Sequence, residues 1–286
     1  MQVDFLRGEA AGCDFLLHGI RNFDLAATFE CGQCFRWEKV CEDTYEGIAF
    51  RKRLRISLSG DTLRLHRTTE DDFSHIWQGY FDLDRNYGAL KDLFRKDAVL
   101  KKAVDFAPGI RVLRQDGWET LCSFILSQNN NITRIRGLVK KLCELFGDAL
   151  PCGGYAFPAP EVLAGKSADD LAAVRCGFRA KYIIDAAKKV AGGEVALDSL
   201  YLLPLDDARA SLQRIHGVGP KVADCTLLFG FGRIECFPVD VWISRVIKQW
   251  FPDGFPEEMM PAAGIAQQYL FHYARVQGMD QPGTAP

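Results

Sequence analysis

Residues 212–250 read LQRIHGVGPKVADCTLLFGFGRIECFPVDVWISRVIKQW, and this stretch decides the fold. A helix is expected to end at Ile215 and His216, where residues 217–219, Gly-Val-Gly, turn the chain. A second helix is expected to start near Pro220, because proline suits the first helical turn. The free amide groups at such a helix start can bind a phosphate. An ordinary helical hairpin accounts for the same glycines.

Two residues of this stretch are candidate catalytic groups. Lys221 lies in the first turn of the second helix, where the positive end of the helix dipole favours the free amine that acts as a nucleophile. Asp240 is predicted to cap the helix over 241–250 and to stay ionised there. Together they suit attack on a sugar carbon with a stabilised oxocarbenium-like charge. A solvated lysine and a plain helix cap are the simpler alternatives.

The cysteines are interpreted mainly as core residues. Cys225 follows Lys221 by four positions and therefore shares its helix face, although packing alone also explains it. The amino terminus lacks the layout of a secretory signal, and no apolar run reaches the ~18 residues of a membrane span. We therefore expect a cytoplasmic protein without a membrane partner, whose 10 Cys are buried small side chains rather than disulfides.

The overall charge excludes some classes of protein. The 286 residues are 48% hydrophobic and carry 35 Lys+Arg against 37 Asp+Glu, a net charge of −2. This balance excludes a histone-like polycation and an acidic tail, and the apolar content argues against disorder. Residues 129–189 nevertheless hold ten basic and six acidic side chains, a local excess of four. Such a basic segment can contribute salt-sensitive affinity for phosphates.

The hydrophobic pattern changes period along the chain. Within residues 1–80 apolar and polar residues alternate, as over 54–58 and 63–65 on either side of a turn at 59–61, which predicts an antiparallel sheet. Helical spacing follows. We expect Asp84 to cap a helix, Asp116 and Glu119 to form a capping box before 118–127, and a stripe over 132–146 to end at Gly147. Further helices are predicted over 167–175, 179–191, 206–214, 221–229, 241–250 and 261–275.

These patterns define an α+β protein of two domains. We place an antiparallel sheet domain with the first helices at 1–105, an all-helical domain at 106–278, and a disordered tail at 279–286.

Six motifs in order carry a family resemblance. They are CGQCFRW at 31–37, YFDLD at 80–84, SQNNNITRI at 127–135, CGFRAKY at 176–182, HGVGPKVADC at 216–225 and FPVDV at 237–241. From about Cys13 to Arg275 the chain resembles the helix-hairpin-helix (HhH-GPD) DNA glycosylase superfamily, and most closely its 8-oxoguanine DNA glycosylase/AP lyase branch. The resemblance implies a TBP-like antiparallel sheet domain followed by a helical glycosylase domain.

The resemblance also implies roles for the hairpin residues. Lys221 matches the nucleophile that forms a Schiff base, and Asp240 matches the carboxylate that assists it. Gly217 and Gly219 match the hairpin that binds a DNA phosphate.

Four residues match the pocket for the damaged base. Phe271 would stack on one face of the extruded base, Cys225 would cover the other, and Gln267 would bind its Watson–Crick edge. The Gly32 carbonyl would accept from the hydrogen that 8-oxoguanine carries at N7, where guanine has an acceptor. Plain core packing is the alternative for Phe271.

Four further residues match contacts to the opposite strand. Asn129 would fill the gap left by the flipped base, and Arg134 and Arg179 would read the orphaned cytosine. Phe178 lies where many relatives have a tyrosine wedge, so an intercalating ring is retained without its hydroxyl.

The implied activity is base-excision repair. The protein would flip 8-oxoguanine, paired with cytosine, out of double-stranded DNA, cleave its glycosidic bond through a lysine Schiff base and nick the strand by β-elimination. The resemblance implies no metal or organic cofactor, and a monomer is the simplest expectation. We expect the protein to act in the cytoplasm, or in the nucleus if the source is eukaryotic.

Three alternatives remain beside this interpretation. One is a monofunctional glycosylase for another damaged base, although Lys221 argues against it. Another is a non-catalytic DNA-binding module, which leaves the pairs Lys221 with Asp240 and Gln267 with Phe271 unexplained. The third takes Cys31 and Cys34 as a redox or metal pair, which lacks a second ligand pair at zinc-like spacing.

Overall fold

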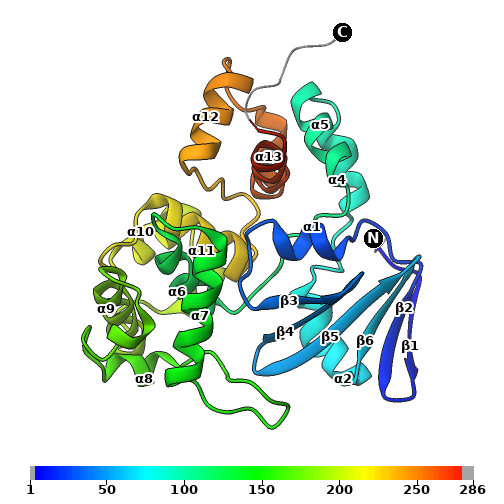
Figure 1. Cartoon of the computed structure of the whole chain (residues 1–286). Helices are drawn as coiled ribbons and strands as arrows, with labels where there is room; N and C mark the ends of the chain where they lie inside the picture. Colours follow the sequence, from blue (N-terminus) through cyan, green and yellow to red (C-terminus); the bar gives the residue numbers. More distant parts are fainter. Residues whose placement is uncertain (1–3, 279–286) are drawn as a thin grey trace.

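The computed structural model describes residues 4–278 and contains an antiparallel sheet followed by helices, as predicted (Figure 1). The six strands lie in the order β1-β2-β6-β5-β4-β3. Their bounds are Arg7–Ala11, Asp14–His18, Trp37–Cys41, Thr44–Ala49, Lys52–Ser59 and Thr62–His66 for β1 to β6. The predicted turn at 59–61 joins β5 to β6, which pair with Ile56 opposite Leu65.

The alternating pattern of β5 and β6 determines which face of the sheet is buried. Leu54, Ile56, Leu63 and Leu65 are each 0% exposed, whereas the arginines between them lie on the outer face. The buried face packs against an aromatic cluster that includes Trp37, Trp77 and Phe81. The sheet domain therefore has a core of its own beside the larger core of the helical part.

Helices and the loops between them make up the rest of the described chain. Helix α1 lies between the sheet and helix α13 (Figure 1). None of the described helices is long and apolar enough to cross a membrane. The α-helices α1 to α13 span, in order, Leu25–Glu30, Glu70–Asp72, Gln78–Tyr80, Tyr87–Phe94, Ala98–Phe106, Gly117–Ser127, Ile132–Phe146, Pro160–Ala164, Arg179–Ala191, Leu205–Gln213, Pro220–Phe231, Val241–Trp250 and Ala263–Gln277. A π-helix spans Phe73–Trp77, and 3₁₀ helices span Ala172–Val174, Leu197–Tyr201 and Glu257–Ala262.

The helices with strong sequence signals lie where they were predicted. α7, α9 and α12 cover the predicted residues, and the α7 stripe ends at Gly147. Asp116 caps α6, because its side chain accepts from the amide of Glu119 at 2.8 Å. The other half of the capping box is replaced by an ion pair between Glu119 and Arg36 at 3.0 Å.

Three predictions of local structure are wrong. Asn86 rather than Asp84 caps α4, because the Asp84 carboxylate accepts from Gln78 instead. The helix predicted over 167–175 is a run of turns ending in a short 3₁₀ helix, where Arg175 adopts φ +63°. Leu145, assigned to the apolar stripe of α7, is 50% exposed. The predicted tail at 279–286 lies outside the described residues, and the domain boundary after residue 105 stays a prediction.

A buried arginine joins the two halves of the chain. Arg111 is 0% exposed and lies in the segment that leads from the sheet domain into α6. Its guanidinium pairs with Asp4 at 2.9 Å and donates to the carbonyls of Phe81 and Asp82 at 3.0 and 2.7 Å. The Tyr87 ring stacks on it, with 4.2 Å between Cζ and the ring centroid. The connecting segment is thereby fixed to elements distant in sequence.

Gln33 fixes the same segment from the other side. Its side chain donates to the Arg111 carbonyl at 2.7 Å and accepts from the Leu113 amide at 2.8 Å. The Gln115 side chain in turn donates to the Gln33 carbonyl at 2.8 Å. Gln33 is fully buried, so the 31–37 motif is a structural element as well as a candidate site.

Replacing Arg111 is expected to destabilise the whole protein. In Arg111→Met the Asp4 carboxylate and several carbonyls lose their buried partner, which should lower the free energy of unfolding by about 3–5 kcal/mol. Denaturant unfolding measures this change. Arg64→Met is the matched control, because Arg64 pairs with Asp14 on the exposed face of the sheet. It should cost at most about 0.5 kcal/mol. Equal losses in the two variants would contradict the role of Arg111.

Candidate active site

The candidate site is a small cavity on which distant segments converge. Its volume is about 50 Å³, and it includes all six residues predicted for catalysis and for the base pocket. The lining residues are Gly32, Phe124, Lys221, Cys225, Phe229, Pro238, Asp240, Gln267, Gln268 and Phe271. Such a volume holds roughly one or two water molecules. A purine therefore enters only if side chains move.

Lys221 and Asp240 both stand at the start of a helix facing this cavity. Lys221 follows Pro220 in the first turn of α11, and its Nζ lies 3.5 Å from Ser127 Oγ. The same Nζ lies 4.9 Å from the ring centroid of Phe124. Asp240 caps α12 as predicted, with Oδ1 accepting from the Ile243 amide at 2.8 Å. The cap holds the Asp240 carboxylate in place beside the cavity that Lys221 also lines.

Ser127 was not singled out from the sequence, although it is the first residue of the SQNNNITRI motif. Its hydroxyl donates to the Phe124 carbonyl at 2.8 Å and so presents an oxygen acceptor to Lys221. The signal was its place in the motif, but a serine at a helix end is too common to identify as a site residue.

Cys225 lies one turn after Lys221 on α11 and is 3% exposed. Burial raises the pKa of its thiol to about 11, although Lys221 beside it acts in the opposite direction. The thiol is therefore neutral at physiological pH. It lines the cavity as an apolar wall. Cys225 is therefore both a packed core residue and a neighbour of Lys221 on the same helix face.

Gln267 and Phe271 lie one turn apart on α13, as their spacing predicts. The Gln267 side chain donates to the Pro238 carbonyl at 3.1 Å. Its Oε1 is buried and has no hydrogen-bond partner among the described residues. A buried acceptor without a partner costs free energy, so this oxygen is available to a donor that enters the cavity. Phe271 is partly exposed at the cavity wall.

Gly32 is required by its backbone as well as by its surroundings. Its φ is +92°, a conformation that side chains rarely allow. A Cβ built on it would lie 3.0 Å from Ile132 Cδ1 and 3.5 Å from Phe271 Cε1. The missing side chain lets the peptide group approach the Phe271 ring.

The four residues predicted for the opposite strand form a second group. Phe178 is 52% exposed, and the Arg179 guanidinium lies 4.5 Å from its ring centroid. Arg179 donates to the Asn129 carbonyl at 3.0 Å, and Asn129 adopts φ +48°. Arg134 is exposed near them on the first turn of α7. The structure brings all four together beside the loop at 128–131.

Arg179 differs from Arg134 in how its donors are used. It is 4% exposed and donates to the carbonyls of Gln128, Asn129 and Cys176. Burial, and then the nearby positive charge of Arg134, lowers the pKa of this guanidinium. Its position matches the prediction, but in this conformation it supports the loop, and only Arg134 presents an exposed guanidinium.

The two hairpin glycines differ in backbone conformation and in the space around them. Gly217 has φ +82°, and a Cβ there would lie 2.4 Å from the Tyr182 ring. Gly219 has φ −94° and ψ −178°, with open space in front of it. Gly217 therefore uses the positive φ that a glycine permits, whereas Gly219 leaves room for the close approach of another group.

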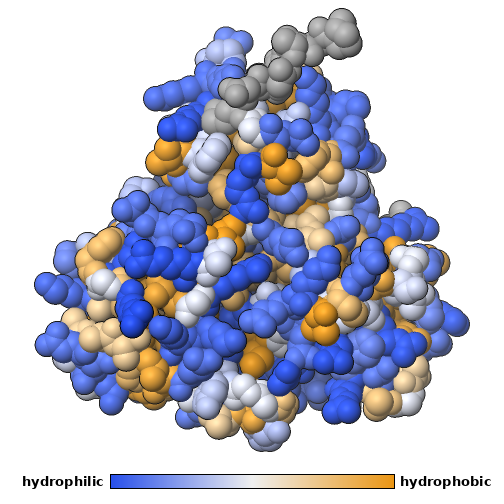
Figure 2. Space-filling model, viewed as in Figure 1, coloured by the Kyte–Doolittle hydropathy of each residue, from blue (hydrophilic) through white to orange (hydrophobic). Residues whose placement is uncertain are grey.

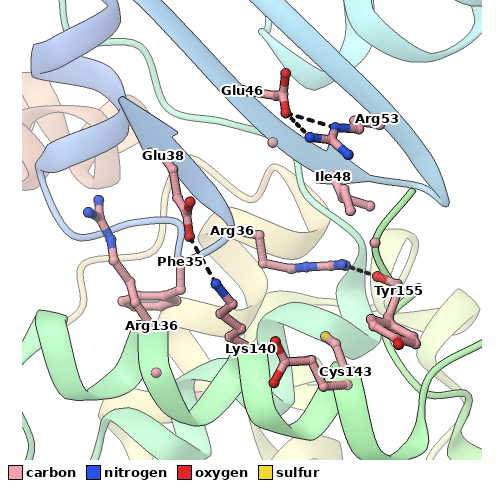
Figure 3. Close-up of a pocket in the computed structure, with 14 residues that line it drawn as sticks. Phe35, Arg36, Glu38, Glu46, Ile48, Arg53, Arg136, Lys140, Cys143 and Tyr155 are labelled. Atoms are coloured by element: carbon pink, nitrogen blue, oxygen red, sulfur yellow. Dashed lines mark hydrogen bonds and ion pairs between the residues drawn. The ribbon is translucent and has the colours of Figure 1, made fainter. Parts of the chain in front are cut away.

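A larger cavity lies elsewhere, between the outer face of the sheet and α7 (Figure 3). Its volume is about 390 Å³, and none of the twelve predicted site residues lines it. Arg36 donates there to the Tyr155 carbonyl, and Lys140 Nζ lies 3.9 Å from Glu38 Oε1. We assign the candidate active site to the smaller cavity because the amine, the carboxylate and the unpartnered amide oxygen gather there.

Cys31 and Cys34 are both buried in the core. Their thiols donate to carbonyls of α1, and burial raises the pKa of both, that of Cys31 to about 11. Within residues 4–278 no group of three or more metal-ligating side chains is present. The contacts are those of core residues, which favours packing over the redox or metal alternative.

Two family models together match most of the chain. The model described as "8-oxoguanine DNA glycosylase, N-terminal domain" matches residues 16–121. The model described as "HhH-GPD superfamily base excision DNA repair protein" matches residues 122–261.

Curated and solved relatives agree with these models. An "N-glycosylase/DNA lyase" of Saccharomyces cerevisiae is 40% identical over 79% of this chain and 67% of its own length. The structure of MBOgg1 with a low-affinity DNA ligand superposes with a TM-score of 0.91 at 44% identity, covering 97% of this chain and 100% of that one. An 8-oxoguanine glycosylase/lyase of Clostridium acetobutylicum, bound to DNA with cytosine opposite 8-oxoG, has a TM-score of 0.90 at 36% identity and covers 96% and 100%.

The two hairpin glycines are expected to respond differently to alanine. Gly217→Ala forces a Cβ into a positive-φ position and against Tyr182, so the free energy of unfolding should fall by about 2 kcal/mol. Gly219→Ala keeps an allowed backbone and meets no atom, so its loss should stay within about 0.5 kcal/mol. Thermal unfolding of the pair measures the difference. A larger loss for Gly219→Ala would show that the hairpin geometry is wrong.

The burial of the thiols is expected to control their reactivity. Cys13, Cys41 and Cys152 are exposed, so the prediction that the cysteines are buried is wrong for these three. At pH 8 iodoacetamide should modify them in the native protein. Cys31 and Cys225 should react only after denaturation, because both are buried and keep their protons at that pH. Peptide mass spectrometry identifies the modified sites. Rapid labelling of Cys31 and Cys34 in the native protein would contradict this prediction and support the interpretation of these residues as a redox pair.

Proposed function

Because the chain belongs to the 8-oxoguanine DNA glycosylase branch of the HhH-GPD superfamily, we propose that it excises 8-oxoguanine paired with cytosine through a Schiff base on Lys221. It is a bifunctional DNA N-glycosylase and lyase of base-excision repair. The observation that carries the proposal is the single cavity shared by the Lys221 amine, the Asp240 carboxylate and the base-pocket residues.

Base flipping is the first requirement of the proposed reaction. The glycosidic carbon is accessible only when the nucleotide leaves the stack. The cavity is too small for a purine, so the partly exposed Phe271 ring is the side chain best able to move aside. Once inside, the base would stack on this ring. The unpartnered Gln267 Oε1 would accept from a donor on the Watson–Crick edge of the base.

Recognition of the lesion is proposed to depend on the Gly32 carbonyl. Guanine presents an acceptor at N7, whereas 8-oxoguanine carries a hydrogen there. A carbonyl oxygen aimed at this atom binds the lesion and faces the lone pair of the normal base. That unfavourable contact is worth about 1–3 kcal/mol.

Lys221 is proposed to attack C1′ of the flipped nucleotide as a free amine. A nitrogen–carbon bond forms while the glycosidic bond breaks, and its electron pair leaves with the base, which takes up a proton. Asp240, fixed by its cap, stabilises the positive charge on the sugar during this step. The sugar ring then opens to an imine. Loss of a 2′ proton expels the 3′ phosphate by β-elimination, and water releases the lysine.

The group beside the loop at 128–131 is proposed to hold the opposite strand. Phe178 is an exposed ring that can enter the stack, and the neighbouring Arg179 binds the carbonyl of Asn129 on the loop. Arg134 is exposed and free to reach the orphaned cytosine, whereas Arg179 does so only if the loop releases its donors. The start of α11 suits a DNA phosphate, because a helix start has free amide groups and open space lies beside Gly219.

We place this activity in a monomer that acts on double-stranded DNA, in the cytoplasm of a bacterium or the nucleus of a eukaryote. The face seen in Figure 2 is largely hydrophilic with small, scattered apolar groups, as a DNA-binding monomer requires.

A monofunctional glycosylase or a non-catalytic binding module would leave the position of Lys221 in the cavity unused.

Borohydride trapping tests the proposed nucleophile. With a duplex that contains one 8-oxoguanine opposite cytosine, the wild-type enzyme should form a covalent adduct, because borohydride reduces the imine. Lys221→Gln should bind the same duplex but lose the adduct and at least about 10³-fold of the excision rate. Gel electrophoresis and release of the free base provide the two measurements.

An undamaged duplex and Lys101→Gln serve as controls. Lys101 is an exposed lysine of α5, outside both the candidate site and the basic segment at 129–189, and its loss should leave both measurements unchanged. Base release by Lys221→Gln at the wild-type rate would refute the role of the lysine. An adduct with the undamaged duplex would refute the specificity for the lesion.

A further inference from the structure

The carbonyls of residues 28–31, at the end of α1, are all bound by side chains from outside this helix. The last carbonyls of a helix have no partner within it. Gln33 donates to the first at 2.9 Å, and Arg136 of α7 donates to the second at 3.1 Å. Arg275 donates to the third at 2.9 Å, and Gln268 donates to the fourth at 3.1 Å. The next peptide group along the chain is that of Gly32.

Two of these four donors come from α13, the helix that carries the base-pocket residues. Gln268 is 2% exposed and follows Gln267 directly. Arg275 lies one turn after Phe271, and its guanidinium lies 5.8 Å from that ring's centroid. Its Nη1 is also 3.5 Å from the position a Cβ would take on Gly32. The two side chains therefore connect the Gly32 segment to the predicted stacking platform.

Gly32 needs such external support because its own backbone is permissive. A glycine populates positive and negative φ about equally, so its carbonyl direction is weakly set by local sterics. After Gly32, the side chain and the carbonyl of Gln33 are bonded to Leu113 and Gln115. Before it, Gln268 holds the Cys31 carbonyl and Arg275 holds the carbonyl one residue earlier. The residues on both sides of Gly32 are thus fixed, which limits the directions that its carbonyl can take.

We propose that Gln268 and Arg275 are positioning residues that set the Gly32 carbonyl against the Phe271 platform and thereby determine how well 8-oxoguanine is distinguished from guanine. This inference rests on the proposed function. The lesion and the normal base differ at N7 by one hydrogen, so discrimination depends on the direction of one oxygen. If that oxygen can turn away, the contact with the lesion weakens and the repulsion of guanine is relieved.

The proposal separates two activities of the same enzyme. Excision of 8-oxoguanine needs the Gly32 carbonyl. A preformed abasic site has no base for this carbonyl to contact, so its cleavage needs only Lys221 and bound DNA. Gln268→Met and Arg275→Met remove the donors while keeping side chains of similar length. Each variant should lose about tenfold in the single-turnover excision rate. Cleavage of a duplex with one abasic site should stay within about twofold of the wild-type rate.

Binding provides a second measurement that does not depend on turnover. In the Lys221→Gln background, the ratio of Kd values for the undamaged and the 8-oxoguanine duplex should fall at least about threefold on adding Arg275→Met. Arg64→Met is the matched control, because it removes an arginine on the exposed face of the sheet. It should change neither the rates nor the Kd ratio.

The outcomes distinguish this inference from the proposed function. Equal losses of excision and abasic-site cleavage in both variants would show general damage to the fold and overturn the positioning role. Wild-type excision in both variants would overturn it as well. If the wild-type enzyme cleaves abasic DNA but releases no 8-oxoguanine, the proposed function fails, and the inference fails with it.

Discussion

The buried guanidinium of Arg111 is the contact on which the arrangement of this molecule depends. It binds carbonyls of the 81–82 segment and the carboxylate of Asp4, while Gln33 holds the backbone of the segment that carries Arg111 itself. Because Gln33 directly follows Gly32, the junction between the domains and one wall of the candidate site are a single structure. The candidate site is therefore assembled only when the sheet domain and the helical domain are joined.

The candidate site itself is built from helix ends. Lys221 and Asp240 each occupy the first turn or the cap of a helix, and the Gly32 segment follows the last turn of α1. Helix ends leave backbone groups without partners, so neighbouring side chains and ligands are drawn to them. Three such ends line one cavity, and α13 forms another wall that is hydrogen-bonded to the end of α1 and to Pro238 before α12.

The sequence predicted those parts of the structure that depend on local pattern. α7, α9 and α12 have complete apolar stripes, and the hairpin glycines and the Asp240 cap have chemical reasons that act over a few residues. The helix expected over 167–175 has a capping box between Ser167 and Asp170, but it shortens to a 3₁₀ helix that ends where Arg175 adopts φ +63°. The family resemblance supplied the residues predicted for the base pocket. Ser127 and Gln268 were missed because only tertiary contacts bring them to the cavity.

The state of the thiols has a consequence for an enzyme that acts on oxidised DNA. Reactive oxygen species attack thiolates much faster than protonated thiols, and only where they can reach the sulfur. Cys225 in the cavity, and Cys31 and Cys34 beside Gly32, are buried, and their pKa values are raised. The repair machinery is thus protected chemically from the oxidants that create its substrate. The exposed cysteines, at Cys13, Cys41 and Cys152, are the thiols that an oxidant can reach, and they lie outside the cavity.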